Sequence, residues 1–314
     1  MVMAGELWFL TGCTAVGKTA LSLELARFLD AEILSCDAVQ VYRGADISSA
    51  KIKSEEMAGI AHYGLDLCDP SETFDVGQYG EYARSIVERV HKKNKALLIV
   101  GGAGFYLKSF FVKVIDDIPV PEPVRAEVRL FHEQFGLAAL QRAVEGYGPV
   151  DLNASDWHNP RRLINILAKQ RVTGWAQRTL KQKFLQNGDP FHSFHRKVIL
   201  LERHPESLDG RIRARVEDMF RNGLREEVQS LGALCPPLAR AIGYREVRAY
   251  LDSAEKMPEE ELKESIVGAT RRLAKKQRTW FRRQIPIDYS INLDAYSSNE
   301  SFDFIATFCR NNRV

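Results

Sequence analysis

The fold is decided by residues 12–19, which read Gly12-Cys13-Thr14-Ala15-Val16-Gly17-Lys18-Thr19. This stretch fits the pattern GxxxxGK[ST] of a phosphate-binding loop, or P-loop. The apolar run before it, residues 7–11, has the length of a strand, and residues 20–29 after it repeat apolar side chains at helical spacing. The sequence therefore predicts a strand, a P-loop and a helix in that order.

The predicted loop has the chemistry to hold a di- or triphosphate. Backbone N–H groups of the glycine-rich turn and the positive end of the following helix would point at one spot. Lys18 adds a positive charge, and the hydroxyl of Thr19 is a candidate ligand for Mg²⁺. We expect all eight residues of the loop to bind phosphate groups, with Thr19 as the metal ligand.

Length and composition describe an ordinary globular protein. The 314 residues allow one large domain with an insertion, or two domains, and a net charge of +3 does not by itself indicate nucleic acid. The five cysteines are scattered without CxxC spacing, which argues against a disulfide framework or a zinc site and fits a reducing cytoplasm. No run approaches the roughly 18 apolar residues of a membrane span, and no signal-like segment begins the chain. We expect a soluble cytoplasmic protein; the sequence is silent on oligomeric state, for which a monomer is our expectation.

Two further strands would end beside the P-loop. Residues 32–36 predict a short strand that ends at Asp37, and residues 96–100 predict an all-apolar strand that ends in Gly101 and Gly102. The carboxyl ends of parallel strands line the ligand crevice, so Asp37 is a candidate for catalysis or metal binding. Many P-loop hydrolases have an aspartate where this chain has the glycines, which counts against a motor-type or switch-type hydrolase.

The rest of the chain predicts helices around one sheet. Three prolines within residues 119–123 mark a boundary, a helical pattern follows, and a strand pattern returns at residues 196–201. The predicted fold is an α/β, P-loop NTPase-like parallel sheet core with a helical insertion domain and a helical C-terminal region. The predicted parts are residues 1–118 for the first part of the core, 119–192 for the insertion, and 193–314 for the completed core with a basic helical region. Residues 45–73 are predicted to be irregular, and the last ~25 residues, from about Tyr289, match no pattern that we can interpret.

The longest helical pattern, residue 258 to about 283, carries a cluster of bases near its end. The cluster is Arg271, Arg272, Lys275, Lys276, Arg278, Arg282 and Arg283, interleaved with Trp280 and Phe281. Compensation of the helix dipole, about 0.3–1 kcal/mol, does not require so many bases. The cluster indicates an anionic partner, of which nucleic acid is the obvious class.

Together with the P-loop, four more motifs in fixed order give the chain a clear resemblance. It resembles the bacterial-type tRNA dimethylallyltransferases, also called tRNA isopentenyltransferases or the IPP transferase family. Residues 36–44, CDAVQVYRG, are similar to the family's D-S-x-Q-x-Y-[RK]-G, and residues 101–106, GGAGFY, to its G-G-T-G-L-Y. Residues 241–246, AIGYRE, and residues 269–283, ATRRLAKKQRTWFRR, resemble its A-I-G-Y-[KR]-E and T-R-x-x-A-K-R-Q-x-T-W-F-R.

The resemblance implies an activity. The family transfers a dimethylallyl group from dimethylallyl diphosphate to N6 of the adenine immediately 3′ of the tRNA anticodon, with release of pyrophosphate and with Mg²⁺ as cofactor. By resemblance, Asp37 would be the general base, Ala103 stands at a catalytic position, and Arg245 is a candidate second cation near the diphosphate. The partners implied are dimethylallyl diphosphate and the anticodon stem-loop of tRNA, which would contact Asp37, Ala38, Val39, Gln40, Ala103, Arg125, Arg161, Arg162, Leu163, Ile164, Asn165, Arg271, Lys275, Lys276 and Arg278.

The chain also departs from the family's pattern. Ala38 stands where the family usually has serine, Ala103 where it has threonine, Asn165 where it has arginine and Ala168 where it has glutamate. Three alternatives therefore stay open: a transferase that acts on free adenine nucleotides, a P-loop kinase of a small metabolite, and a degenerate paralogue that binds tRNA without catalysis. Transfer of label from dimethylallyl diphosphate to tRNA, to AMP or to neither would separate them.

Overall fold

A computed structural model describes residues 5–114, 116, 118–186, 188–254 and 257–313. The chain divides into two compact units. The core unit consists of Met1–Val114 and Pro190–Val314, and the helical unit is Ile115–Asp189. The helical unit overlaps most of the predicted insertion, residues 119–192.

The core unit is built on a parallel sheet with the strand order β3-β2-β4-β1-β5-β6. The strands are β1 (Glu6–Gly12), β2 (Ala31–Cys36), β3 (His62–Tyr63), β4 (Ala96–Gly101), β5 (His195–Glu202) and β6 (Tyr289–Asn292). Strand β1 lies between β4 and β5, with both of its faces covered, which explains why it reads as a continuous apolar run. The predicted α/β fold with a P-loop core is confirmed.

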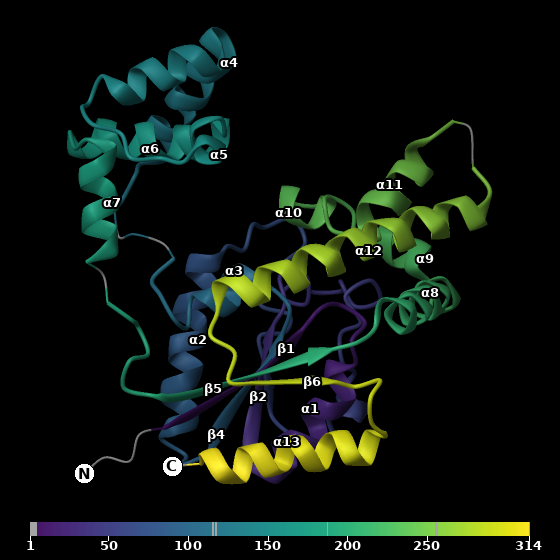
Figure 1. Cartoon of the computed structure of the whole chain (residues 1–314). Helices are drawn as coiled ribbons and strands as arrows, with labels where there is room; N and C mark the ends of the chain where they lie inside the picture. Colours follow the sequence, from purple (N-terminus) through teal and green to yellow (C-terminus); the bar gives the residue numbers. More distant parts are fainter. Residues whose placement is uncertain (1–4, 115, 117, 187, 255–256, 314) are drawn as a thin grey trace. The chain divides into compact units, whose positions relative to one another are not determined.

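Helices cover the sheet of the core unit (Figure 1). They are α1 (Lys18–Leu29), α2 (Val76–His91), α3 (Gly104–Lys108), α8 (Pro205–Arg221), α9 (Leu224–Ser230), α10 (Pro236–Ala239), α11 (Tyr244–Asp252), α12 (Glu259–Gln284) and α13 (Ser298–Asn312), with a 3-10 turn at Ser54–Met57. Helix α12 packs against α8, α11 and α3, and α13 packs against α1. The basic helix predicted from the sequence therefore belongs to the core unit.

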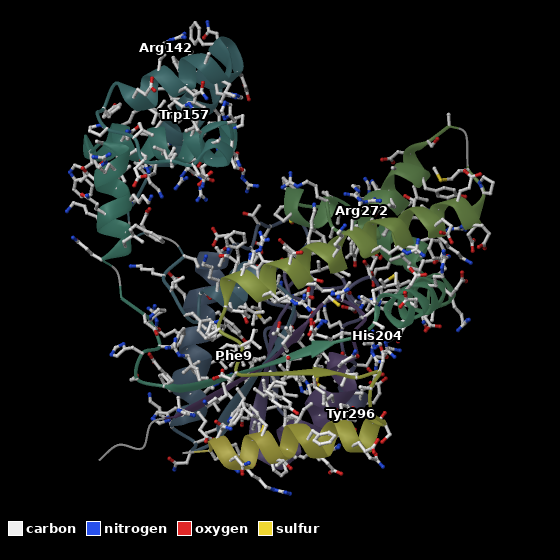
Figure 2. The ribbon with its side chains drawn as sticks, viewed as in Figure 1. Phe9, Arg142, Trp157, His204, Arg272 and Tyr296 are labelled. Atoms are coloured by element: carbon white, nitrogen blue, oxygen red, sulfur yellow. The ribbon has the colours of Figure 1, made fainter. Side chains whose placement is uncertain are left out.

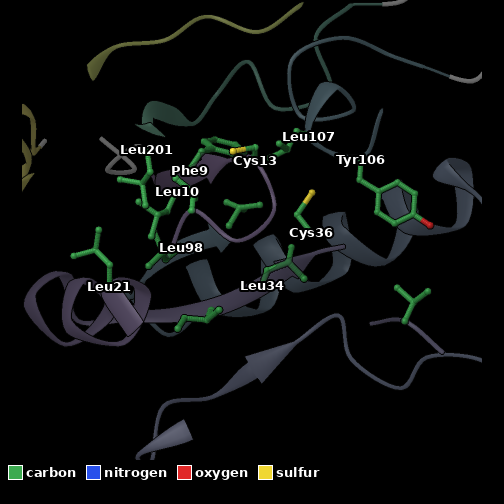
Figure 3. Packing of buried hydrophobic residues seen from close by; sticks show 14 of the residues in the cluster. Phe9, Leu10, Cys13, Leu21, Leu34, Cys36, Leu98, Tyr106, Leu107 and Leu201 are labelled. Carbon is green, nitrogen blue, oxygen red and sulfur yellow. The ribbon is translucent and has the colours of Figure 1, made fainter. Parts of the chain in front are cut away.

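One continuous apolar core lies beneath the P-loop (Figure 3). Phe9 and Leu10 of β1, Leu34 of β2 and Leu98 of β4 are fully buried there. The ring of Phe9 meets that of Phe110 edge to face, with 5.2 Å between centroids. This packing fixes the strand ends, and with them the loops that follow.

Two segments contain more structure than the sequence predicts. The region predicted to be irregular, residues 45–73, includes the 3-10 turn and the two-residue strand β3. The last residues, which matched no interpretable pattern, form β6 and α13. Strand β6 was missed because its four residues lie at the sheet edge with Ile291 as their one fully buried apolar side chain, too little for a periodic signal.

The helical unit has a core of its own. Its helices are α4 (Glu122–Glu145), α5 (Ala154–Trp157), α6 (Pro160–Thr173) and α7 (Gln177–Leu185), and α4 is interrupted at Gly136. The buried residues are Val128, Leu140, Val144, Leu163, Leu167 and Ala168, contributed by α4 and α6. Among the described residues of both units, no helix is long and apolar enough to cross a membrane.

Candidate active site

The P-loop joins β1 to α1 and leaves several amides without partners. Gly12 has a positive φ of 153°, and a Cβ atom there would lie 2.6 Å from the carbonyl oxygen of Leu201, so only glycine fits. In the described part of the chain, no acceptor takes a hydrogen bond from the backbone N–H of Ala15, Gly17, Lys18 or Thr19. These amides surround the start of α1, where an anion is favoured by the helix dipole.

Lys18 reaches back over this loop. Its Nζ donates to the carbonyl oxygens of Gly12 and Cys13, at 2.9 Å in each case. Burial lowers the pKa of Lys18 to about 8, an effect to which Arg215 adds and which Asp37 opposes. Lys18, Arg215 and Asp37 are thus close enough to influence one another electrostatically.

Arg215 of α8 is a site residue that the sequence reasoning missed. Its guanidinium donates to the carbonyl oxygen of Ser48 at 2.9 Å, while its Nε is buried with no partner in the described part of the chain. Burial lowers the pKa of Arg215, and Asp37 opposes the shift. The signal was present, because Arg215 shares a helical face with the buried Leu208 and Ile212.

Asp37 follows β2 directly and is held in a fixed orientation. Its Oδ1 accepts hydrogen bonds from the amides of Val39 at 2.8 Å and Gln40 at 3.3 Å. Ala103, after the end of β4, donates its N–H to the carbonyl oxygen of Cys36 at 3.1 Å. Asp37 and Ala103 therefore lie side by side on neighbouring strand ends, on the rim where the sequence predicted them.

The side chains of Val39 and Gln40 make their contacts mainly within the protein. The side-chain Oε1 of Gln40 accepts a hydrogen bond from Ser35 Oγ at 2.6 Å, and its Nε2 donates to the carbonyl oxygen of Ser49 at 3.2 Å. Val39 packs against the main core, whereas Ala38 is exposed. Of the predicted RNA contacts in this turn, Ala38 has the most exposed side chain.

The motif at residues 241–246 supports the site from behind. Ser48 Oγ donates to the carbonyl oxygen of Ile242 at 2.6 Å. Tyr244 OH donates to Glu227, whose other carboxylate oxygen accepts from the amide of Ile47 at 2.7 Å. The motif thereby holds the loop whose Ser48 carbonyl receives the guanidinium of Arg215.

Arg245 differs from its prediction as a cation near the diphosphate. Its side chain is half exposed and ion-paired with the adjacent Glu246. The cation that lies beside Lys18 and Asp37 is Arg215. The physical reason is helical direction, because α11 turns Tyr244 and Val247 inward and leaves Arg245 outside.

Helix α12 is fastened to the P-loop through Gln277. Its Oε1 accepts from the amide of Thr14 and its Nε2 donates to the carbonyl oxygen of Gly102, at 2.9 Å each. Arg278, the next residue, is near enough to lower the pKa of the Cys13 thiol, although burial raises that pKa overall. The basic helix therefore adjoins the P-loop.

The predicted cations of α12 do not all have the same surroundings. Arg271 is ion-paired with Asp209 of α8, a pairing that helps to hold the pKa of Asp209 below its usual range. Lys275 and Lys276 are exposed and line an open hollow on the helix. The charge of Arg271 is thus already neutralised within the protein.

The outer side of the P-loop is braced by a pair that the sequence reasoning also missed. Arg203 donates its Nε–H to the carbonyl oxygen of Val16 at 2.8 Å and is ion-paired with Asp294. Asp294 also accepts from the amide of His204 at 2.7 Å and from Ser207 Oγ at 2.8 Å. A residue that follows β6 thus helps to fix the loop that follows β1.

The helical unit gathers its own basic surface. Arg125 donates to the side-chain carbonyl of Asn165 at 2.9 Å, and both line an open hollow of about 420 Å³ with Arg161 and Ile164. The prediction that Leu163 contacts RNA is wrong for its side chain, which is fully buried in the core of this unit. Leu163 anchors α6 in this core, one turn before Leu167.

Arg162 completes the predicted set in this unit. It is ion-paired with Asp156 at 3.3 Å and remains largely exposed. Its backbone N–H donates to the side-chain carbonyl oxygen of Asn159, which caps the start of α6. The guanidinium therefore lies at the surface near the first turn of that helix.

The residues present suit Mg²⁺ that is held mainly by a bound ligand. Thr19 is exposed at the first turn of α1, where its hydroxyl is available as one oxygen donor. The described residues contain no group of three or more histidines, cysteines, aspartates or glutamates that could hold a metal by itself. Mg²⁺ commonly binds through few protein ligands together with phosphate oxygens and water.

Comparisons with known proteins agree on one family. The family model described as IPP transferase matches residues 40–284. A tRNA dimethylallyltransferase from Opitutus terrae is 40% identical over 298 residues, 92% of this chain and 95% of that protein. The crystal structure of the full-length tRNA isopentenylpyrophosphate transferase from Bacillus halodurans has a TM-score of 0.71 at 29% identity, over 98% of this chain and 96% of that one.

A more distant structure shares the fold. A eukaryotic dimethylallyltransferase acting on tRNA has a TM-score of 0.79 at 21% identity, over 99% of this chain and 81% of that one. The match of the family model and the identity to the bacterial relatives lead to one conclusion. The chain belongs to the IPP transferase family of tRNA dimethylallyltransferases.

Proposed function

We propose that this protein transfers a dimethylallyl group from dimethylallyl diphosphate to N6 of the adenine 3′-adjacent to the tRNA anticodon. The proposal is carried by two observations: Lys18 contacts the carbonyl oxygens of the P-loop, and Asp37 interacts electrostatically with both Lys18 and the buried Arg215. Two cations suit a diphosphate, and a carboxylate beside them suits a base. Membership of the IPP transferase family supports the same reaction.

The diphosphate would bind where amides and cations converge. The free N–H groups of Ala15, Gly17, Lys18 and Thr19 would donate to its oxygens. Burial lowers the pKa of both Lys18 and Arg215, and a bound anion would reverse that effect because it stabilises their charged forms. In this arrangement the pyrophosphate is a stabilised leaving group.

The carboxylate of Asp37 would serve the other reactant. As N6 of adenine forms its bond to C1 of the dimethylallyl group, the bond from C1 to the diphosphate oxygen breaks, and its electron pair leaves with pyrophosphate. The N6 proton passes to Asp37, whose Oδ1 is already held by the amides of Val39 and Gln40. The fixed carboxylate is thus available as a general base.

Thr19 is the residue that would hold Mg²⁺. When bound, the ion would neutralise charge on the departing pyrophosphate. The hydroxyl of Thr19 supplies one ligand, and the substrate's phosphate oxygens would supply others. Lys18 and the loop amides would hold the same phosphate groups from the protein side.

Both units would bind the RNA backbone. In the core unit, the candidate contacts are Lys275, Lys276 and Arg278 of α12, together with Ala38 and Ala103 at the rim of the site. In the helical unit, the candidates are Asn165 and three cations of α4 and α6: Arg125, Arg161 and Arg162. Such contacts would offset the few kcal/mol required to take the target base out of its stack.

We also place the protein in the cytoplasm as a monomer. All five cysteines are buried and free, which fits a reducing compartment. Each would be protected from solvent oxidants by the core in which it lies.

The test is transfer of label. The protein and Mg²⁺ are incubated with labelled dimethylallyl diphosphate and either unmodified tRNA or AMP, with Asp37→Asn as the matched inactive variant. Label in tRNA that depends on Asp37 supports the proposal. Label in AMP alone would move the activity to free nucleotides, and label in neither would contradict a transferase function.

A further inference from the structure

A second feature beside the active site combines the aromatic rings of Phe105 and Trp280 with cations that form no ion pair among the residues that the structure describes. An open groove of about 570 Å³ runs along the outer face of α12, lined by Arg272, Lys275, Lys276, Trp280 and Arg283. Phe105, at the first turn of α3, lies next to Trp280. We call these six residues the aromatic-basic groove; Figure 2 labels Arg272 on α12.

The basic side chains of this groove differ from their neighbours on α12 in their ion pairing. Arg271 and Arg282 of the same helix are ion-paired, with Asp209 and Glu202 respectively. No acid in the described part of the chain forms an ion pair with the four basic residues that line the groove. The groove therefore carries a net positive charge that is available to an anionic polymer.

Phe105 is unusual in its exposure. Its ring is 63% exposed, although the next residue, Tyr106, is buried. The ring centroids of Phe105 and Trp280 are 6.5 Å apart and the ring planes are inclined at 52°. Since the family pattern has leucine at this position, the aromatic ring is a property of this chain.

Gly104 brings the two rings together. A Cβ atom at Gly104 would lie 2.8 Å from the Trp280 indole, so the indole rests directly on the backbone of the turn. Phe105 follows that turn at once and therefore stands beside the indole. The pair is built by close packing of α12 on the start of α3.

The pair also adjoins the reaction centre. Gln277, one helical turn before Trp280, bonds to the amide of Thr14 in the P-loop and to the carbonyl oxygen of Gly102. Ala103, next in the chain, lies beside Asp37. A nucleotide in contact with Phe105 would consequently be a near neighbour of one whose base lies at Asp37.

We propose that Phe105 and Trp280 form a stacking platform for the base of the nucleotide that flanks the target adenosine in the RNA loop, while Lys275, Lys276, Arg272 and Arg283 bind its phosphates. The inference rests on the proposed function. A target base that leaves its stack exposes the faces of its neighbours, and an aromatic side chain can replace the lost contact. Stacking also accepts any base, which suits a platform that serves several RNA sequences.

The test uses an unmodified anticodon stem-loop RNA with 2-aminopurine at the nucleotide 3′ of the target. In complex with the wild-type protein, the probe's emission should be quenched because its base stacks on the aromatic pair. Phe105→Ala should lose this quenching and weaken RNA binding by about 5- to 150-fold. Phe105→Tyr should retain both properties, whereas Phe105→Leu, which keeps apolar area without an aromatic face, should behave like the alanine variant.

Two controls separate stacking from other effects. Phe304→Ala removes an exposed phenylalanine of α13 that is 46% exposed and should change neither readout. Lys275→Ala should weaken binding without abolishing the quenching, and should reduce the slope of log affinity against log salt by about 1.

The outcomes also separate this inference from the proposed function. Wild-type transfer of a dimethylallyl group to the RNA, together with unchanged affinity and emission for Phe105→Ala, would overturn the platform and leave the activity standing. Failure of the wild-type protein to bind the RNA would overturn both.

Discussion

The pH dependence of diphosphate binding offers a direct test of the site, because it follows from one residue. Lys18 lies over the P-loop, and its burial lowers its pKa from 10.5 to about 8. In the ligand-free protein, its ammonium is therefore about nine-tenths charged at pH 7 and about one-tenth charged at pH 9. The terminal phosphate of a diphosphate monoester, with a pKa of about 6, stays ionised throughout this range.

If only the charged ammonium binds the diphosphate, affinity should fall as pH rises through about 8. Between pH 7 and pH 9 the expected loss is about tenfold, or about 1.4 kcal/mol. The sign follows from the direction of the shift: the pKa of Lys18 is lowered, so its charge is lost inside the assay range instead of above it. Dimethylallyl diphosphate without RNA, titrated by calorimetry at half-unit steps of pH, provides the measurement.

The matched variant is Lys18→Arg, whose guanidinium stays charged over the whole range. Its affinity, whatever its absolute value, should be flat between pH 7 and pH 9. A wild-type affinity that is also flat would refute the assignment of Lys18 as the titrating ligand. An equal decline in the arginine variant would point to another group, and the argument from burial would then be wrong.

Three further predictions concern single side chains. Asp37→Asn should lower kcat at least about 100-fold with little change in the KM for dimethylallyl diphosphate, because the amide oxygen can still accept from Val39. Steady-state kinetics with both substrates measures kcat and KM separately. A raised KM with normal kcat would contradict the role of Asp37 as a general base. Arg215→Gln should weaken diphosphate binding by about 12- to 150-fold. Arg213→Gln, which changes an exposed neighbour paired with Glu264, should not weaken it. Equal effects of the two variants in calorimetry would show that Arg215 does not bind the diphosphate. Ala103→Thr should raise kcat/KM by about 2- to 12-fold through one added hydrogen bond. It should also raise Tm, since residue 103 is the N-cap of α3 and its side chain makes no capping hydrogen bond. Loss of activity in this variant would show that the pocket of this chain is shaped for alanine.

The sequence was most informative where one short segment carries its own geometry. The P-loop, Asp37 and the glycines at the end of β4 lie at strand ends, and parallel strands bring those ends to one edge. Their placement on one rim could therefore be predicted from strand patterns alone. The basic helix was equally visible, because its length and charge pattern lie within a single element.

The missed residues depend on contacts between distant segments. Helical spacing sets Arg215 on the same face of α8 as the buried Leu208 and Ile212, but only the packing of that helix shows that this face meets the loop at Ser48. Arg245 seemed the better candidate because it belongs to a motif, yet that motif acts through Ile242 and Tyr244, which hold the loop near Ser48. No local pattern could show that Asp294 braces a loop at the other end of the chain.

The strand that ends in the P-loop is the first to be synthesised and among the last to be enclosed. Leu7 pairs with Leu97 on one side and with Arg196 on the other, so a ribosome must add most of the chain before both edges of β1 are covered. Asp294 emerges later still, and with it the ion pair that steadies the carbonyl of Val16. During translation the apolar strand β1 is therefore exposed before its neighbouring strand β5 has been made. Such exposure favours aggregation and makes chaperones valuable. The complete phosphate cradle becomes available only after Asp294 has left the ribosome.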